Sequence, residues 1–168
     1  DDSLVFLKKN NSTRPSFFFF FLVNRAGSLM VSAFTGEIFE ITAKGLERRY
    51  SIPTDLVVRS VLFDSKDSLW LGTEAGVFRT SAKNPVLKMA DLKLISKELA
   101  YEMIETSDGS VWMGLIVGGM RYQKGRLLKF GPHNGFTNFL VKGLLEDREG
   151  NIWFTTDGDG VYKFSNLA

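Results

Sequence analysis

Four stretches of this sequence can be laid over one another without a gap, and this internal repeat restricts the fold more than any other feature. The stretches are anchored on Met30, Trp70, Trp112 and Trp153, which follow one another at intervals of 40 to 42 residues. Repeats of this length are typical of solenoids and propellers, in which one supersecondary unit is copied along the chain. Because the apolar residues do not recur with the 3.6-residue period of a helix, the sequence favours a repeated β-unit over a helical solenoid.

Each copy carries the signature of a tight hairpin just before its anchor. The residues six and three positions before the four anchors are Asn24 and Gly27, Asp64 and Asp67, Thr106 and Gly109, and Asp147 and Gly150. The short polar side chain can accept a hydrogen bond from the backbone ahead, and Gly adopts the exit conformation of the turn. An apolar strand precedes each turn. Three consecutive apolar residues around the anchor follow it, and such a run indicates a strand covered on both faces.

The repeat therefore predicts an all-β fold, a β-propeller of four four-stranded antiparallel blades in a single domain of residues 1–168. We expect the blade repeats at residues 17–50, 57–90, 100–130 and 140–168, with the fourth strand of the second blade at 86–89. One apolar strand is surplus at the front of the chain and one is missing at the back, so residues 3–9 are expected to complete the last blade. The sequence leaves open whether the blades close alone, pair with a second copy or belong to a longer array.

Charge and composition exclude several classes of protein. Lys and Arg number 21 and Asp and Glu 19, a net charge of +2, and basic residues occur only in doublets, so no nucleic-acid partner is expected. The absence of cysteine excludes disulfides, thiolate zinc sites and cysteine nucleophiles. The longest apolar run, residues 17–23, is far shorter than the roughly 20 residues of a membrane-spanning helix. The repeat assigns this run to a strand rather than to a signal peptide.

The repeat resembles that of the two-component regulator propeller family. The resemblance rests on LLEDREGNIWFTT at residues 144–156 with GVYKF at 160–164, on DSLWLGT at 67–73 with GVF at 76–78, and on DGSVWMG at 108–114. The first copy, with Met30 in place of Trp, is the most divergent. The resemblance implies a periplasmic or extracytoplasmic sensor region of a hybrid histidine kinase, with further propeller or kinase sensor domains as partners and glycans or other small ligands as targets. Family rings have about seven blades.

Motifs for catalysis or metal binding are weak, and we expect no catalytic residue, metal or cofactor. The single histidine, His133, cannot build a two-His zinc site and lies in a Gly-rich linker. Asp157 and Asp159 resemble the start of a calcium loop, but its twelfth position is Ala168 instead of Glu. A Trp repeated at one blade position is expected between blades rather than at a sugar-stacking surface.

Ligand-binding residues of a propeller are expected in the loops around the channel mouth, where a rigid scaffold presents variable side chains. The candidates are Arg59, Glu74, Tyr101, His133, Asn138, Lys142, Asp157 and Asp159. We favour a non-catalytic module that binds a ligand or a partner, and a homodimer is compatible with the repeat count. The alternative is a metal-dependent lyase or lactonase that resembles streptogramin B lyase and uses His133. A pure scaffold is the third possibility.

Overall fold

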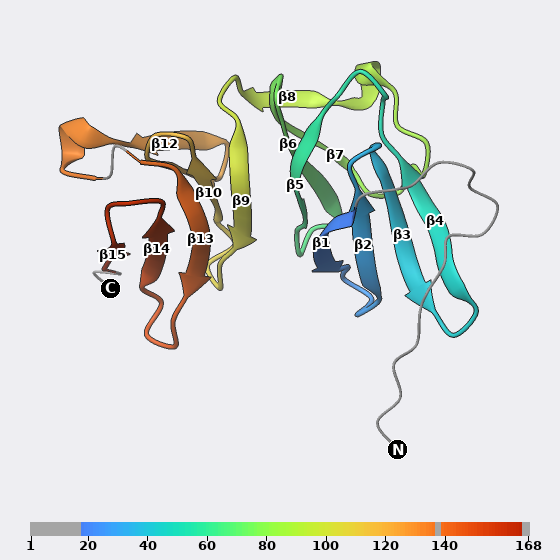
Figure 1. The fold of residues 1–168 in the computed structure, drawn as a ribbon, viewed down its shortest axis with the longest axis horizontal. Helices are drawn as coiled ribbons and strands as arrows, with labels where there is room; N and C mark the ends of the chain where they lie inside the picture. Colours follow the sequence, from blue (N-terminus) through green and yellow to red (C-terminus); the bar gives the residue numbers. More distant parts are fainter. Residues whose placement is uncertain (1–17, 137–138, 166–168) are drawn as a thin grey trace.

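A computed structural model describes residues 18–136 and 139–165, and its regular structure is almost entirely β-strand. The described strands form four antiparallel sheets in chain order, which we call blades 1 to 4 (Figure 1). Blade 1 contains β1 (Phe18–Val23), β2 (Leu29–Ala33), β3 (Glu37–Thr42) and β4 (Gly45–Ser51), and blade 2 contains β5 (Val58–Phe63), β6 (Ser68–Thr73), β7 (Gly76–Ser81) and β8 (Lys93–Ser96). Blade 3 contains β9 (Ala100–Glu105), β10 (Val111–Leu115), β11 (Gly119–Gln123) and β12 (Arg126–Phe130), and blade 4 contains β13 (Val141–Glu146), β14 (Ile152–Thr156) and β15 (Val161–Phe164). The predicted all-β propeller architecture is confirmed.

Helical structure in the described ranges is limited to two short 3-10 turns, η1 (Met89–Asp91) and η2 (Pro132–Asn134). No helix there has the length and apolarity needed to cross a bilayer.

The first hairpin of blades 2 and 4 is built by the polar residue six positions before the anchor. The Asp64 carboxylate accepts hydrogen bonds from the backbone N–H groups of Lys66 (3.0 Å) and Ser68 (2.7 Å), and Asp147 makes the equivalent bonds in blade 4 at 3.1 and 2.8 Å. The residue three positions before the anchor has a positive φ in all four turns, between 57° and 80°. Gly adopts this conformation at little cost, which explains why Gly occupies three of the four positions. The predicted turn chemistry is confirmed.

The same carboxylate also fixes the anchor side chain. Asp64 Oδ2 accepts a hydrogen bond from Trp70 Nε1 at 2.9 Å, and Asp147 Oδ2 accepts one from Trp153 Nε1 at 2.7 Å. One residue therefore sets both the turn and the direction in which the tryptophan enters the space between blades.

Every blade has two packing faces. We call the face that meets the next blade the leading face and the face that meets the preceding blade the rear face. Met30, Trp70 and Trp112 project from leading faces and are only 1%, 1% and 3% exposed. They pack, respectively, on Leu69 and Leu71 of blade 2, on Val111 and Met113 of blade 3, and on Ile152 and Phe154 of blade 4. Because successive strand residues point to opposite faces, each anchor points forward and its two neighbours point backward.

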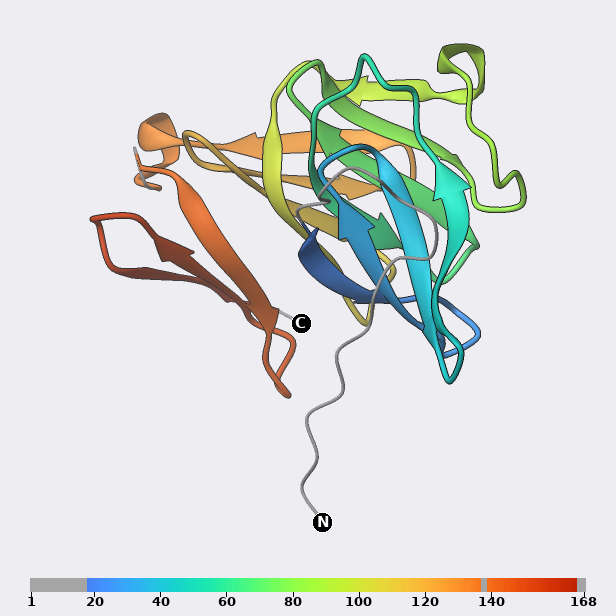
Figure 2. The same ribbon diagram turned by 45° about the vertical axis from the view of Figure 1, so that its right-hand side comes forward.

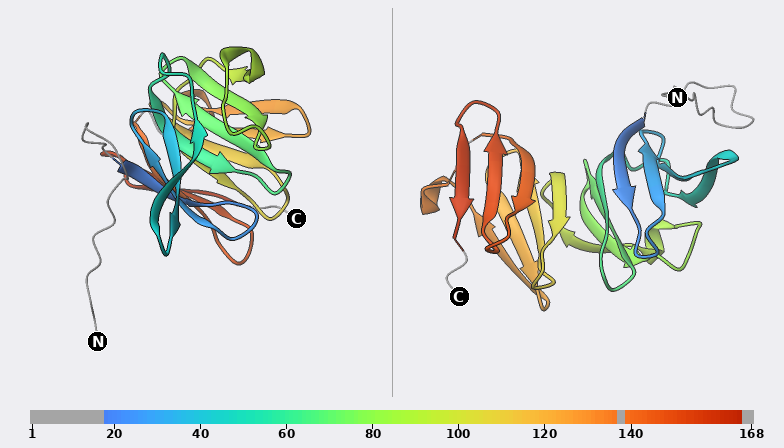
Figure 3. Two further views of the ribbon diagram at one scale, coloured as in Figure 1. Left: turned by 90° about the vertical axis from the view of Figure 1, so that its right-hand side faces the viewer. Right: turned by 90° about the horizontal axis from the view of Figure 1, so that it is seen from below.

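The blades follow one another in an arc with the first strand of each blade innermost. Strands β1, β5, β9 and β13 pack on one another in succession, and the views in Figures 2 and 3 show blade 4 at the opposite end of the arc from blade 1. Within the described residues, the strands of blades 1 and 4 do not pack together as those of consecutive blades do. The leading face of blade 4 is accordingly exposed, with Leu145 at 63% and Val161 at 61%, whereas Ile38 and Val77, which are equivalent to Val161, are fully buried.

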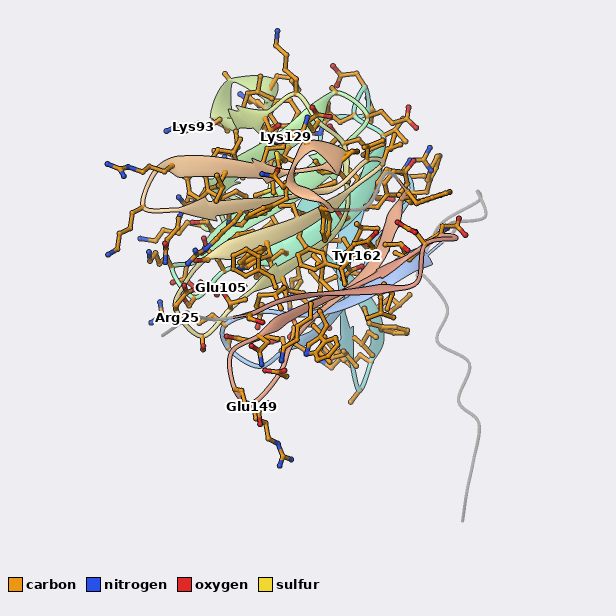
Figure 4. All side chains as sticks on the ribbon, turned by 90° about the vertical axis from the view of Figure 1, so that its left-hand side faces the viewer. Arg25, Lys93, Glu105, Lys129, Glu149 and Tyr162 are labelled. Carbon is orange, nitrogen blue, oxygen red and sulfur yellow. The ribbon has the colours of Figure 1, made fainter. Side chains whose placement is uncertain are left out.

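Side chains join the hairpin turns of consecutive blades. A serine donates both its backbone N–H and its hydroxyl to a glutamate at the end of the next blade's first strand, and in the first pair of blades an ion pair takes this place. The pairs are Ser65 with Glu105 (2.6 and 2.7 Å), Ser107 with Glu146 (2.7 and 2.6 Å) and Arg25 with Asp67 (3.0 Å). Arg25 and Glu105 lie at the same end of the molecule in Figure 4. These contacts, which we call turn clamps, fix the position of each blade along the axis of the arc relative to the next blade.

The fourth strand of blade 2 lies at Lys93–Ser96 and not at residues 86–89, where the sequence analysis expected it. Val86 instead forms an isolated parallel bridge with Ser51 at the end of β4 in blade 1, and Leu87 is buried in the cluster between blades 1 and 2. The apolar residues at 86–89 therefore seal a junction between blades. Blade 4 has three strands in the described part of the chain, and residues 3–9, predicted to add its fourth, lie outside the described residues.

Alanine substitutions should destabilise the fold more at an anchor buried between two blades than at an anchor on the exposed face of blade 4. Trp70→Ala removes a fully buried side chain between two blades and should lower the free energy of unfolding by about 3–5 kcal/mol. Trp153→Ala is the matched control, because Trp153 makes the same hydrogen bond to its turn aspartate but is only partly buried on the open face of blade 4. Its loss should be clearly smaller in urea titrations followed by circular dichroism. Equal losses for the two variants would contradict this packing arrangement.

Acid should weaken the fold through the turn aspartates. Burial alone would raise the pKa of Asp147, but hydrogen bonds from Trp153 and Asn151 outweigh it and lower the pKa to about 2; hydrogen bonds from Thr106 and Ser110 likewise lower the pKa of Asp108 to about 2. The unfolded chain therefore binds more protons than the folded chain between about pH 4 and 2, and stability is lost as the pH falls through this window. The slope of unfolding free energy against pH should be shallower for Asp147→Asn. An unchanged slope in Asp147→Asn would contradict this account.

Candidate functional site

The first strand of every blade carries a bulge at the same register position. The pairing with the second strand skips one residue between Phe18 and Phe20 in blade 1, and it skips Arg59, Tyr101 and Lys142 in blades 2, 3 and 4. A bulge turns its extra residue out of the normal strand alternation, and bulges are common where a strand presents a side chain for binding. Because these strands are innermost, the bulged residues of successive blades lie round the axis of the arc.

The loop between the second and third strands of each blade lies at the same end of the sheet as the bulge. Backbone hydrogen bonds attach it to the start of the first strand, from Glu74 N to the Val57 carbonyl (3.1 Å) in blade 2 and from Asp157 N to the Leu140 carbonyl (2.9 Å) in blade 4. The equivalent loop residues are Phe34, Glu74, Ile116 and Asp157. Together with the bulged residues Arg59, Tyr101 and Lys142 they form what we call the bulge-loop face.

Two blades present an acid–base pair on this face. Arg59 pairs with Glu74, and Lys142 pairs with Asp157 at 3.4 Å. The Arg59 guanidinium also lies 5.5 Å from the ring centroid of Phe34 in the preceding blade, and its Nε is buried without a hydrogen-bond partner in the described structure. Arg59 therefore lies between two blades, and its Nε–H group makes no hydrogen bond there.

The other two blades present apolar groups at the equivalent positions. Phe34 in blade 1 is 38% exposed, and Ile116 and Val117 in blade 3 are 53% and 40% exposed beside the partly buried Tyr101. Exposed apolar side chains at a rigid loop cluster are typical of binding surfaces. The loop residues of the bulge-loop face, Phe34, Glu74, Ile116 and Asp157, therefore alternate between apolar and acidic from blade to blade.

One further carboxyl group lies next to this face. Glu102 follows the bulged Tyr101 and pairs with Gly114 in the sheet. Burial raises the pKa of Glu102 above its ordinary value. The group is thus a partly dehydrated acid on the inner strand of blade 3.

The remaining predicted candidates are distributed differently. His133 is exposed in η2, in the linker between β12 and β13. The Asp159 carboxylate accepts a hydrogen bond from the Tyr162 hydroxyl, so this residue orders its own loop. Asn138 lies outside the described residues. In those ranges no group of three or more His, Cys, Asp and Glu side chains is placed to hold a metal ion.

Both members of each ion pair were predicted from the sequence, but their pairing was not, and Phe34 and Glu102 were not among the predicted residues. Phe34 could have been found by extending the repeat alignment four residues past Met30, since that step reaches Glu74 from Trp70 and Asp157 from Trp153. Nothing in the sequence marked Glu102, because its raised pKa arises from burial by tertiary contacts.

The fold is that of a β-propeller, and the bulge-loop face lies at one end of its inner strands. The family described as two component regulator propeller matches residues 135–158, which include the whole of the first two strands of blade 4. The resemblance noted in the sequence is confirmed for that repeat. A search of curated proteins gave no match.

Solved structures with the same architecture include two extracellular domains of two component systems and a lyase. The extracellular domain assigned to the hybrid two component system BT3049 of B. thetaiotaomicron aligns with a TM-score of 0.68 at 22% identity, over 89% of this chain and 22% of that one. The corresponding domain of BT4673 from the same organism aligns with a TM-score of 0.69 at 18% identity, over 94% of this chain and 22% of that one. Virginiamycin B lyase from Staphylococcus aureus aligns with a TM-score of 0.64 at 15% identity, over 95% of this chain and 59% of that one. The chain spans about a fifth of the length of these two extracellular domains, and the similarities establish the fold.

Removing the two ion pairs should change stability little. Exposed ion pairs contribute about 0–1 kcal/mol, so Arg59→Gln with Glu74→Gln, or Lys142→Gln with Asp157→Asn, should each shift the free energy of unfolding by no more than about 1 kcal/mol in chemical denaturation. Losses as large as that of Trp70→Ala would show that the pairs hold the blades together and are not available for recognition.

Proposed function

We propose that this chain is a non-catalytic recognition module from the extracytoplasmic, periplasmic sensor region of a two-component regulator, and that the bulge-loop face binds its ligand. The single observation that carries the proposal is the bulge repeated in every blade, which directs Arg59, Tyr101 and Lys142 toward the loops at one end of the inner strands. The turn clamps, which hold the blades together, lie at the other end of these strands. The extracellular domains of two component systems among the structural neighbours support the class of function.

The chemistry of the face favours a ligand with both apolar and polar groups. Exposed aromatic and aliphatic side chains supply flat contact area, and the charged pairs supply directional hydrogen bonds that fix orientation. Glycans and peptides both offer this combination. The lyase or lactonase alternative has the fold similarity as its support, and no observation on this face favours it.

A binding screen tests the proposal. The chain should bind at least one member of an array of neutral and acidic oligosaccharides and short peptides, measured by thermal shift and then by calorimetry. Loss of a hydrogen bond to a charged group costs about 1.5–3 kcal/mol, so Arg59→Gln with Lys142→Gln should weaken that binding roughly tenfold or more.

The matched control is Lys124→Gln with Arg126→Gln, which removes the same charge from an exposed hairpin at the opposite end of blade 3. It should bind like the unsubstituted chain. No binding across the array, or equal weakening in both double variants, would count against the bulge-loop face, and turnover of a lactone panel would favour the enzyme.

A further inference from the structure

The junction between blades 1 and 2 contains a pocket of about 220 Å³ at the end of the sheets where the turn clamps lie. We call it the first-junction pocket. The last strand and a turn of blade 1 form one side of it, and the first strand, a turn and the residues after β7 of blade 2 form the other. Its wall residues are Asn24, Arg25, Ala26, Tyr50, Phe63, Asp67, Ala82 and Lys83. The pocket is therefore at the opposite end of the inner strands from the bulge-loop face.

The repeat provides a direct comparison for this pocket. A second pocket, of only about 40 Å³, lies between blades 3 and 4. Five of its wall residues are the repeat equivalents of five wall residues of the first-junction pocket. The pairs are Thr106 and Asn24, Ser107 and Arg25, Asp108 and Ala26, Glu146 and Phe63, and Gly150 and Asp67. The two pockets thus occupy the same place in their junctions, and the first is several times larger.

Two replacements along the repeat contribute to the larger volume. Trp112 is a wall of the smaller pocket, and its equivalent in blade 1 is Met30, which has no ring. Glu146 accepts two hydrogen bonds across the junction of blades 3 and 4, and its equivalent in blade 2 is the apolar Phe63. A space that an indole and a turn clamp fill in one junction is therefore open in the other.

One wall of the first-junction pocket is aromatic. The ring centroids of Tyr50 and Phe63 are 5.4 Å apart, and the rings are inclined at 49°. The Tyr50 hydroxyl donates a hydrogen bond to the Ala82 carbonyl at 2.9 Å, which fixes the orientation of the ring. A planar apolar group can pack on a ring held in this way.

The rim of the pocket carries more positive than negative charge. Arg25 and Lys83 are exposed cations, and the one acidic wall residue, Asp67, pairs with Arg25 at 3.0 Å. Lys83 has no ion-pair partner among the described residues. Asn24 Oδ1 accepts a hydrogen bond from the Ser28 N–H at 2.9 Å, and the amide N–H groups of Asn24 have no acceptor in the described ranges. Unused donors and a net positive charge suit a carboxylate.

We propose that the first-junction pocket binds a small planar aromatic carboxylate, with its ring against Tyr50 and its carboxylate at Lys83 and Asn24. An indole with a short acid chain has both groups. The bound ring supplies, between blades 1 and 2, an aromatic contact of the kind that Trp70 and Trp112 supply at the later junctions. This site is separate from the bulge-loop face and does not depend on it.

Calorimetric titration of the full chain with indoleacetate tests the proposal. Indoleacetamide lacks the charge and cyclohexylacetate lacks the planar ring, so each should bind roughly tenfold more weakly or worse. The tripeptide Gly-Gly-Trp presents the same ring and carboxylate at a chain end. Its affinity relative to indoleacetate distinguishes a free acid from a peptide terminus as the source, and binding of either supports the pocket.

Substitutions at the exposed rim should change affinity without unfolding the chain. Lys83→Gln should weaken indoleacetate binding roughly tenfold and leave indoleacetamide unaffected, whereas Lys83→Arg should retain the acid. Lys124→Gln removes the same charge from an exposed hairpin at the same end of blade 3 and is the matched control. Ala26→Trp places a ring at the pocket wall and should also reduce binding. Circular dichroism checks that each variant is folded.

Three results would overturn the proposal. They are an absence of binding by every probe, equal affinity for the acid and its amide, and equal weakening by Lys83→Gln and Lys124→Gln. The double variant Arg59→Gln with Lys142→Gln should bind indoleacetate like the unsubstituted chain, and a loss there would place the acid on the bulge-loop face instead. Failure of this site and failure of the bulge-loop face are thereby distinguished.

Discussion

The fold depends on one interaction repeated along the chain, the insertion of an anchor side chain from the leading face of one blade into the rear face of the next. Met30, Trp70 and Trp112 are each almost fully buried in this way, and in blades 2 to 4 the residues on either side of the anchor are buried against the preceding blade. A sheet covered on both faces cannot alternate polar and apolar residues, which accounts for the apolar triplets. Each blade thus needs neighbours on both sides, and blade 4, whose leading face has none among the described residues, has the most exposed third strand.

The turn aspartate connects local and long-range order. In blades 2 and 4 one carboxylate oxygen accepts the turn N–H groups while the other orients the anchor indole. Blade 3 has Thr106 at this position, and Asp108 takes over the turn, accepting hydrogen bonds from Thr106 and Ser110 and pairing with Arg121. The hairpin therefore forms equally well when the carboxylate that accepts its hydrogen bonds lies two residues later in the chain. In blade 2 the turn aspartate thus also orients Trp70, the side chain that packs blades 2 and 3 together. A few residues close together in the sequence therefore specify the repeat.

This short-range coding explains what the sequence could and could not predict. The first three strands of each blade follow the anchors at fixed intervals, and their places were predicted. The fourth strand of blade 2 was misplaced because Val86 and Leu87, apolar enough for a strand, serve the junction with blade 1. The bulges were not predictable, since one skipped residue leaves no mark on the pattern. Arg59 and Glu74 were therefore each named as loop residues, while their pairing had to come from the structure.

The two ends of the inner strands differ in how far their residues repeat from blade to blade. The turn clamps and the aspartate–indole bonds are all at one end, where Ser65, Ser107 and their glutamate partners repeat. At the other end the equivalent positions hold unlike residues, apolar at Phe34 and Ile116 and acidic at Glu74 and Asp157. Surface charges contribute little to stability, so substitutions on the bulge-loop face escape the constraint that packing imposes on the anchors. Residues repeat where they hold the blades together and vary on the bulge-loop face, a difference that accords with the recognition role we propose.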